Sequence, residues 1–326
     1  MTENLSNAAI QNQFEITRYL ILIPYTIVVY DYALTVKQEV ARFWGTTLTW
    51  GTALFYLNRY SALFGTVPIV TEYFMTTNDP TKTALCHAFS QYHTYFALLS
   101  QILVSVMLIM RTYALYERNK YILFLTIGVT LAAIIVALAV ILTESDVNTL
   151  SAQLQAYGCP SPVPHATNLR DAIAWGGMLV FDVMIFSLTV YKAMKHGVRT
   201  GSLFSVLFRD GSLYFSVMIA SNAINIGTYT MSGPILSGCM TTMTNALSSV
   251  VISRLMLNLR NPNIRRLRHR KPTRTTTNMD FATMHENTVT PYLGTDIALD
   301  SVWMGPQSRD DWDDDYLTHA RTVQES

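Results

Sequence analysis

The chain has 326 residues, of which 50% are hydrophobic and only 14% are charged, and its mean hydropathy is +0.23. Soluble globular chains carry about 25% charged residues, so these values argue against a soluble fold. Lys and Arg number 23 against 22 for Asp and Glu, which excludes a generally basic nucleic-acid binder. Three cysteines are too few for a small protein held together by disulfides. The composition favours a protein whose solvent is the lipid bilayer.

Seven windows are long and apolar enough to cross a bilayer, which takes about 20 mostly apolar residues. They cover residues 16–36, 46–71, 88–110, 121–142, 171–191, 213–231 and 235–257. The window at 121–142 contains no charged residue, whereas Arg59 interrupts the second window and Asp182 the fifth. The sequence therefore predicts an all-α fold, a bundle of seven transmembrane helices within residues 16–257.

Two segments flank this predicted bundle. Residues 1–15 form a short extracellular stretch without the basic patch that begins a signal peptide, so we expect the first helix to be retained. Residues 258–326 form a polar tail with a basic run at 260–274 and an acidic cluster at 310–315. Segregated charge and low hydrophobicity predict a disordered tail. The basic run either binds anionic lipid or only fixes the topology.

The positions of Lys and Arg predict the orientation, because loops rich in these residues stay on the cytoplasmic side. Basic residues are concentrated after the first, third, fifth and seventh windows. The only Lys and Arg residues expected on the opposite side are Arg18, Lys82 and Arg170. We therefore expect the amino terminus outside, the carboxyl terminus in the cytosol, and insertion in the plasma membrane.

This topology places two cysteines in the oxidising compartment. Cys86 lies at the outer mouth of the third window, and Cys159 lies in the loop between the fourth and fifth windows. A disulfide between them would close a long loop and stabilise the fold by roughly 4 kcal/mol. Two unpaired thiols are the alternative. Cys239, inside the seventh window, is expected to behave as a small apolar residue.

Charged side chains at membrane depth cost a few kcal/mol, so they normally face the bundle interior and have partners. Arg59 and Asp182 differ in expected depth by about 6 Å, a distance that two side chains can bridge. Further polar residues are expected near the same level: Gln101, Asn222, Asn225 and Asn245. This polar core is either a ligand or ion pocket or a set of interhelical hydrogen bonds that holds the bundle together.

Polar residues nearer the cytoplasmic face allow two further predictions. Asp31 lies about 12 Å from the expected level of Arg59, so we expect it to meet a hydroxyl, water or another cation. At the inner end of the third helix, Arg111, Tyr113 and Tyr116 stand where a receptor would place a conformational latch. A snorkelling arginine with interfacial tyrosines is the alternative.

Signatures of catalysis and cofactor binding are scarce. His87, His93 and His165 are expected near the outer face, and their spacing matches no standard zinc pattern. No phosphate-binding glycine loop or nucleophile elbow stands in a suitable context. We therefore expect no enzymatic activity, no cofactor and no bound metal.

Several blocks of sequence resemble a known family. The most specific block, within residues 19–64, contains Asp31, Tyr32, Thr35, Glu39, Trp44, Asn58, Arg59 and Tyr60. It is similar to the signature of a large group of basidiomycete fungal membrane proteins whose shared segment is a domain of unknown function. Blocks around Arg111, Arg209 and Arg254 resemble the same proteins. The resemblance implies a seven-helix membrane protein that is often compared with G-protein-coupled receptors and has no established activity.

The comparison with rhodopsin-like receptors fails at their activation switches. The third helix ends in Met110-Arg111-Thr112-Tyr113 rather than in Asp/Glu-Arg-Tyr, and the seventh lacks an Asn-Pro-x-x-Tyr sequence. Those switches are therefore not carried over to this chain.

Two functions remain open. In the first, an unknown small ligand enters from the outer face, changes the packing around Arg59 and Asp182, and alters cytoplasmic loops that bind a signalling partner. In the second, the chain transports a small solute, with or without protons, and uses the same two charges. The absence of the internal repeat that is common in carriers argues against transport.

Overall fold

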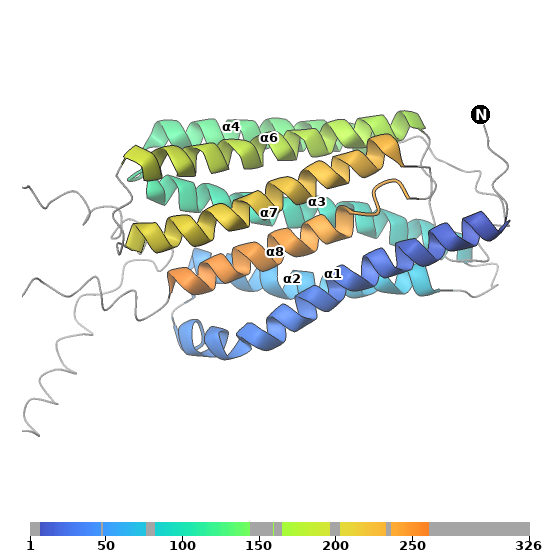
Figure 1. Ribbon diagram of the computed structural model, residues 1–326, viewed down its shortest axis with the longest axis horizontal. Coiled ribbons are helices and arrows are strands. Elements are labelled where there is room, and N and C mark those ends of the chain that lie inside the picture. Colours follow the sequence, from blue (N-terminus) through green and yellow to red (C-terminus); the bar gives the residue numbers. More distant parts are fainter. Residues whose placement is uncertain are drawn as a thin grey trace, which may run out of the picture.

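The structure is a computed structural model that describes residues 7–46, 48–75, 82–143, 159, 165–195, 203–232 and 236–260. Within these ranges the chain is all-helical (Figure 1). The seven helices are α1 (Asn7–Arg42), α2 (Trp50–Phe74), α3 (Lys82–Leu115), α4 (Lys120–Leu142), α6 (His165–Lys195), α7 (Leu203–Met231) and α8 (Thr241–Leu259). The predicted disorder of the tail, with its basic run and acidic cluster, falls on residues outside the described ranges beyond Arg260.

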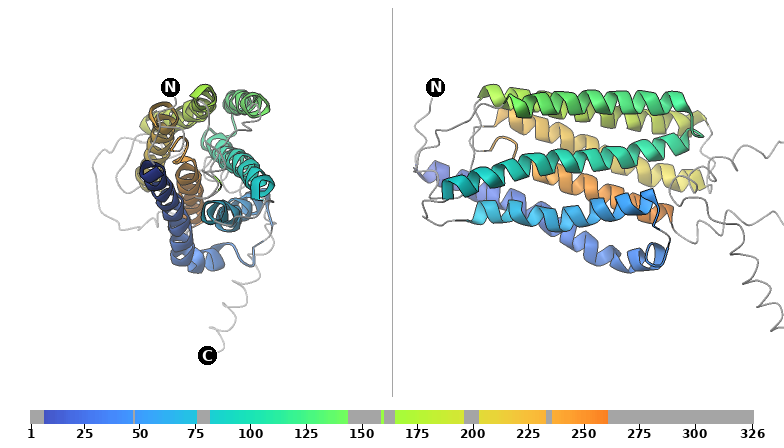
Figure 2. Two further views of the ribbon diagram at one scale, coloured as in Figure 1. Left: turned by 90° about the vertical axis from the view of Figure 1, so that its right-hand side faces the viewer. Right: turned by 180° about the vertical axis from the view of Figure 1, so that it is seen from behind.

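The helices lie side by side and run in alternate directions along the long axis of the bundle (Figures 1 and 2). The carboxyl ends of α1, α3, α6 and α8 and the amino ends of α2, α4 and α7 therefore share one end of the bundle. Basic residues gather there, and we call it the basic end; among them are Arg42, Arg118, Lys120, Lys192, Lys195 and Arg260. The opposite end, which contains Cys86 and Cys159, is the disulfide end.

Four helices are long and apolar enough to cross a membrane, namely α1, α3, α4 and α6. Of these four, α4 has the smallest buried share, and Phe124, Leu131 and Ile135 on its surface are more than half exposed. A long apolar helix whose large side chains face away from the protein is favourable against lipid rather than water. The chain is therefore a membrane protein with several transmembrane helices.

The other three helices, α2, α7 and α8, do not meet the same limits of length, hydropathy and charge over the residues that the structure describes. For α8 this agrees with its position, because it contacts α1, α2, α3 and α7 and lies in the middle of the bundle (Figure 2). Most of its residues are buried, including Thr244, Asn245, Ser248 and Ser249. A helix that is surrounded by other helices needs no lipid-compatible surface, so polar residues can occupy it.

The helix ends depart from the expected windows. Most helices extend beyond their windows, because a hydropathy window measures only the apolar part of a helix. Helix α2 nevertheless begins at Trp50 rather than near 46, where the Thr49 hydroxyl accepts a hydrogen bond from the Thr52 amide. Helix α8 begins only at Thr241, because residues 236–240 form a turn with Gly238 at a φ of 68°. Cys239 therefore lies in this turn rather than in the last helix.

The apolar core lies toward the basic end. The rings of Phe43 and Phe55 stack with centroids 3.9 Å apart, and both side chains are buried. Around them pack Met107 and Leu108 of α3, together with buried residues of α6, α7 and the second half of α8. Among the residues that the structure describes, side chains pack closely in this half of the bundle, and a larger cavity lies toward the disulfide end.

Candidate functional site

One face of α1 carries two buried carboxyl groups. Asp31, Thr35 and Glu39 are spaced four residues apart, so they lie on one side of the helix. Asp31 is 4% exposed and Glu39 is fully buried. A buried carboxylate is costly unless it meets a cation or several hydrogen-bond donors. This face of α1 therefore requires partners from neighbouring helices.

Arg59 of α2 is the first partner. Its Nε lies 2.7 Å from Glu39 Oε2, and its Nη1 lies 3.7 Å from Asp31 Oδ2. Its Nη2 donates a hydrogen bond to Thr35 Oγ1 at 2.5 Å. The guanidinium also lies over the ring of Tyr32, 5.0 Å from the centroid, a distance that gives a cation–π attraction.

Arg254 of α8 is the second partner. Its Nε donates to Asp31 Oδ1 at 2.5 Å, and its side chain remains 42% exposed. Glu39 Oε1 accepts hydrogen bonds from the Tyr60 hydroxyl at 2.9 Å and from the Trp44 indole at 3.3 Å. Two carboxylates thus meet two guanidinium groups, and we call this set the charged cluster: Asp31, Glu39, Arg59 and Arg254.

Arg59 contacts Asp31 and Glu39, although the expected helix ends separated it from Asp31 by about 12 Å and brought it within reach of Asp182. Asp31 also meets another cation, as expected, because Arg254 contacts it. Counted from the helix ends that the structure shows, Asp31 lies about 16 Å before the end of α1, and Arg59 lies about 14 Å after the start of α2. The two residues therefore share a level. The expected second window starts four residues before α2, and the expected first window ends six residues before the end of α1. Together these differences account for the separation of about 12 Å expected between the levels of Asp31 and Arg59.

Hydrogen bonds beside the charged cluster tie α8 to the first two helices. Asn58 Nδ2 donates to the Ser249 carbonyl and to Ser253 Oγ, both at 3.2 Å, and Ser249 Oγ donates to the Asn58 carbonyl at 3.3 Å. Arg42 donates to the Leu257 carbonyl at 2.6 Å, near the end of α8. The residues of the signature block therefore position a third helix as well as each other.

Asp182 lies in a different part of the polar core. Its Oδ2 accepts a hydrogen bond of 2.5 Å from Asn222 Nδ2 on α7, and Asp182 is 4% exposed. The hydroxyl of Ser221, the residue before Asn222, lies 2.9 Å from that of Thr244 and links α7 to α8.

The remaining predicted core residues also form pairs. Gln101 Nε2 of α3 donates to Asn245 Oδ1 of α8 at 2.7 Å. Thr241 Oγ1 of α8 donates to Asn225 Oδ1 of α7 at 3.3 Å. The structure therefore divides the expected polar core into the charged cluster and several separate interhelical pairs.

The predicted latch residues lie at the basic end of α3, where Arg111 does not snorkel. Arg111 is 6% exposed and lies over the ring of Phe215 on α7, 5.5 Å from its centroid. The Tyr116 hydroxyl donates to the Leu188 carbonyl of α6 at 2.8 Å. Tyr113 is half-buried. Arg111 is buried because its face of α3 points toward α7 and not toward the surface of the bundle.

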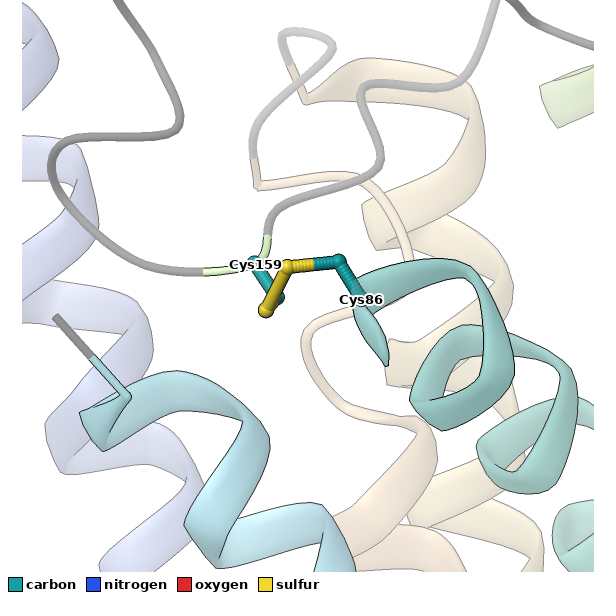
Figure 3. Close-up of a disulfide and its surroundings, with 2 residues drawn as sticks. All are labelled: Cys86 and Cys159. Atoms are coloured by element: carbon teal, nitrogen blue, oxygen red, sulfur yellow. A yellow bond between two sulfur atoms is a disulfide. The ribbon is translucent and has the colours of Figure 1, made fainter. Parts of the chain in front are cut away.

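The expected disulfide between Cys86 and Cys159 is confirmed (Figure 3). Their Cα atoms lie 5.1 Å apart, within the range of disulfides, and Cys159 is buried. The bond fastens Cys159, which precedes α6, to the amino-terminal part of α3. It lies about one helical turn from Ser90, where a cavity begins.

The cavity has a volume of about 210 Å³ and lies at the disulfide end between α2, α3, α4, α6, α7 and the turn before α8. Its polar lining includes Glu72 of α2, His93 of α3, Asp171 of α6 and Tyr229 of α7. Gln101 also lines it and connects it to α8 through Asn245. Concave sites with a few convergent polar groups are the usual places for small ligands.

Sequence reasoning missed this cavity. Glu72 lies one residue beyond the expected second window and Asp171 is the first residue of the fifth, so neither counted as an intramembrane charge. His93 was considered only as a metal ligand. Its Nδ1 lies 3.9 Å from Glu72 Oε2 and its Nε2 lies 3.2 Å from Thr242 Oγ1. Among the residues that the structure describes, no group of three or more His, Cys, Asp or Glu side chains could hold a metal ion.

These features define an all-helical membrane protein with a disulfide and a cavity at one end and a charged cluster toward the other. Residues 19–64 match the model of DUF6533, a family of unknown function. The expected domain of unknown function in this segment is therefore confirmed. No curated protein and no solved structure matches the chain. The matched segment runs from α1 to the middle of α2 and contains three of the four residues of the charged cluster.

Proposed function

We propose that the chain is a seven-span receptor of the plasma membrane, with its amino terminus outside and its carboxyl terminus in the cytosol. The resemblance to fungal seven-helix membrane proteins supports this architecture. So does the separation of charge, because the basic residues that retain loops in the cytosol gather at the end opposite to the disulfide. The disulfide end then faces outward, and the basic end faces a signalling partner.

The cavity of about 210 Å³ at the disulfide end carries the proposal of a receptor. A ligand there touches several helices at once, because lining residues come from α2, α3, α4, α6 and α7. It also touches Gln101, which is hydrogen-bonded to Asn245 of α8. Helix α8 is in turn tied to α1 and α2 through Asn58 and Arg254. A ligand with different affinities for two arrangements of these helices would shift the population at the basic end.

The experiment measures the distance between two helix ends at the basic end. Trp50 at the start of α2 and Met194 at the end of α6 are 82% and 72% exposed, so cysteines at these positions accept spin labels. Cys239, the free cysteine, is replaced by Ser in this background. Compounds that raise the unfolding temperature of the full chain in nanodiscs are then added to the labelled protein, and double electron–electron resonance measures the distance between the two labels. We expect a compound that binds in the cavity to change the distance distribution between the labels.

Two controls separate a receptor from a simple binder. Ala174→Phe places a ring in the cavity, because Ala174 is a lining residue, and it should abolish both the stabilisation and the distance change. Epitope tags at the two termini should be reached by antibody on opposite sides of the membrane. Cavity-dependent stabilisers that change no distance at the basic end would rule out the receptor, and tags on one side would rule out seven spans.

The second candidate, a transporter of a small solute or of protons, has one observation in its favour. Asp182 is 4% exposed, and the hydrogen bond that it makes comes from the neutral side chain of Asn222. A buried acid with a neutral partner can take up and release a proton. Flux into proteoliposomes that disappears in Asp182→Asn would establish transport. Flux that is absent in the wild type would exclude it. In neither candidate does the chain act as an enzyme.

A further inference from the structure

The cavity at the disulfide end has one sign of charge. Glu72 and Asp171 line it from two different helices, and among the described residues that line it none is Lys or Arg. A cavity wall of low dielectric strengthens the field of such carboxylates. An anionic ligand would therefore be repelled, and a cation would be attracted.

Glu72 is the side chain with the clearest need for a ligand. It is 3% exposed, and its Oε2 accepts no hydrogen bond. The nearest cationic candidate is His93, whose Nδ1 lies 3.9 Å from that oxygen, beyond hydrogen-bond distance. A buried carboxylate oxygen without a donor is destabilising, because it loses water and gains nothing in exchange. A donor that enters the cavity would remove this cost.

Aromatic rings complete the lining. Tyr73 follows Glu72 on α2, Trp175 lies one helical turn beyond Asp171 on α6, and Tyr229 comes from α7. The faces of such rings attract organic cations, most strongly when water is excluded. Carboxylates together with several aromatic rings are the combination that recognises protonated amines and quaternary ammonium groups.

We propose that this cavity binds a small organic cation, a protonated amine or a quaternary ammonium, with Glu72 and Asp171 as the countercharges. The volume of about 210 Å³ lies below the 300–1,000 Å³ of sites for drug-sized molecules, which favours a small amine. The inference specifies the ligand class of the proposed receptor, but the binding itself does not depend on signalling.

The experiment compares matched probes on the full chain in nanodiscs. Three ammonium probes, methylammonium, tetramethylammonium and phenethylammonium, are titrated at neutral pH. Their uncharged matches are methanol, neopentyl alcohol and 2-phenylethanol, in that order, and phenylacetate is the anionic match of phenethylammonium. We expect at least one ammonium probe to raise the unfolding temperature saturably. Its uncharged match should bind about tenfold more weakly or worse, and phenylacetate should have no effect, because the attraction comes from the two carboxylates.

Variants identify the site. Glu72→Gln and Asp171→Asn are close in shape to the native side chains, and each should weaken ammonium binding about tenfold or more. They lie on separate helices, so one remains usable if the other fails to fold. Glu15→Gln is the matched control, because Glu15 is a half-exposed carboxylate at the same end that pairs with Arg18 outside the cavity lining. It should leave the affinity unchanged.

Three results would overturn the inference: equal stabilisation by an ammonium probe and its uncharged match, full affinity in the variant with both carboxyl groups replaced, or no response to any ammonium probe. Its failure is distinguishable from failure of the receptor. Ammonium binding that leaves the α2–α6 distance unchanged supports the cation site and rejects the receptor. An uncharged stabiliser that changes this distance does the reverse.

Discussion

The two halves of the bundle treat their buried glutamates in opposite ways. In the half toward the basic end, Asp31 and Glu39 meet Arg59 and Arg254 at short distances, and large apolar side chains fill the remaining space. In the half toward the disulfide end, Glu72 keeps an oxygen without a hydrogen bond beside a cavity. Carboxylates paired with guanidinium groups hold helices in place, whereas a buried carboxylate oxygen without a donor beside a cavity can accept a ligand.

The match to DUF6533 follows the same division. It ends at residue 64, before α2 reaches Glu72 and Tyr73, so the matched segment contributes to the packed half and not to the cavity. The segment therefore has a structural role that its own residues explain: it forms a helical pair around Arg59 and binds α8 through Asn58. The cavity residues lie elsewhere in the chain, and they are the ones that would set ligand choice.

The largest effect is expected from Arg59→Gln. Removal of the guanidinium leaves Asp31 and Glu39 buried without their main countercharge, and breaking a buried ion pair costs about 3–5 kcal/mol. The measurement is the stability of the purified chain in detergent against denaturant. Glu15→Gln, which weakens only the partly exposed pair with Arg18, should cost less than about 1 kcal/mol. Equal losses in the two variants would contradict a structural role for the charged cluster.

Loss of the disulfide should come next and should be local. Cys159→Ser is expected to destabilise the protein by about 2–4 kcal/mol, since the bond closes a long loop. Hydrogen exchange should rise at the disulfide end of α3 and α6, and ammonium binding should weaken, while the exchange of α1 near Asp31 stays unchanged. Cys239→Ser is the control, because that thiol is free. A uniform rise in exchange would mean that the two halves are one cooperative unit.

The substitution Asp182→Asn should have a smaller effect on stability, and of the opposite sign. Asp182→Asn removes a buried carboxyl group whose hydrogen-bond partner is a neutral amide, and the new amide can still accept from Asn222 Nδ2. We expect the stability to rise by about 1 kcal/mol, because an amide costs less to bury than a charge. Asp31→Asn, in which the lost charge is paired, should lower the stability. If Asp182→Asn were the more destabilising of the two, an undetected cation would have to lie beside Asp182.

The sequence predicts the helical membrane architecture because lipid constrains composition over long windows. It predicts the Cys86–Cys159 bond because topology assigns both thiols to one compartment. It places helix ends less well, because hydropathy does not register capping by Thr49 or the positive φ of Gly238. The early start assigned to α2 then misplaced Arg59 and concealed its pair with Asp31.

Contacts between distant helices were beyond the sequence for another reason. Depth along a helix can be counted, but the rotation of each helix and its neighbours cannot. The pair of Gln101 and Asn245 joins α3 to α8, and that of Asp182 and Asn222 joins α6 to α7. Residues at one expected level were therefore assigned to one core, although they face different neighbours. The sequence does not predict the cavity, because its two carboxylates lie at the edges of the apolar windows, where charged residues are common.

The smallest effect concerns the turn between α3 and α4 at the basic end. Arg118 has a φ of 63°, a left-handed conformation that costs a residue with a Cβ about 1–2 kcal/mol. Arg118→Gly removes this strain but increases the freedom of the unfolded chain by about 0.5–1 kcal/mol, so a net gain of about 0.5 kcal/mol is expected. Arg118→Ala deletes the same side chain and keeps the strain, so it should give no gain. Equal unfolding midpoints for the two variants would show that the backbone of this turn relaxes to a conformation without strain. The surface turns at the basic end would then be less rigid than the apolar core beside them.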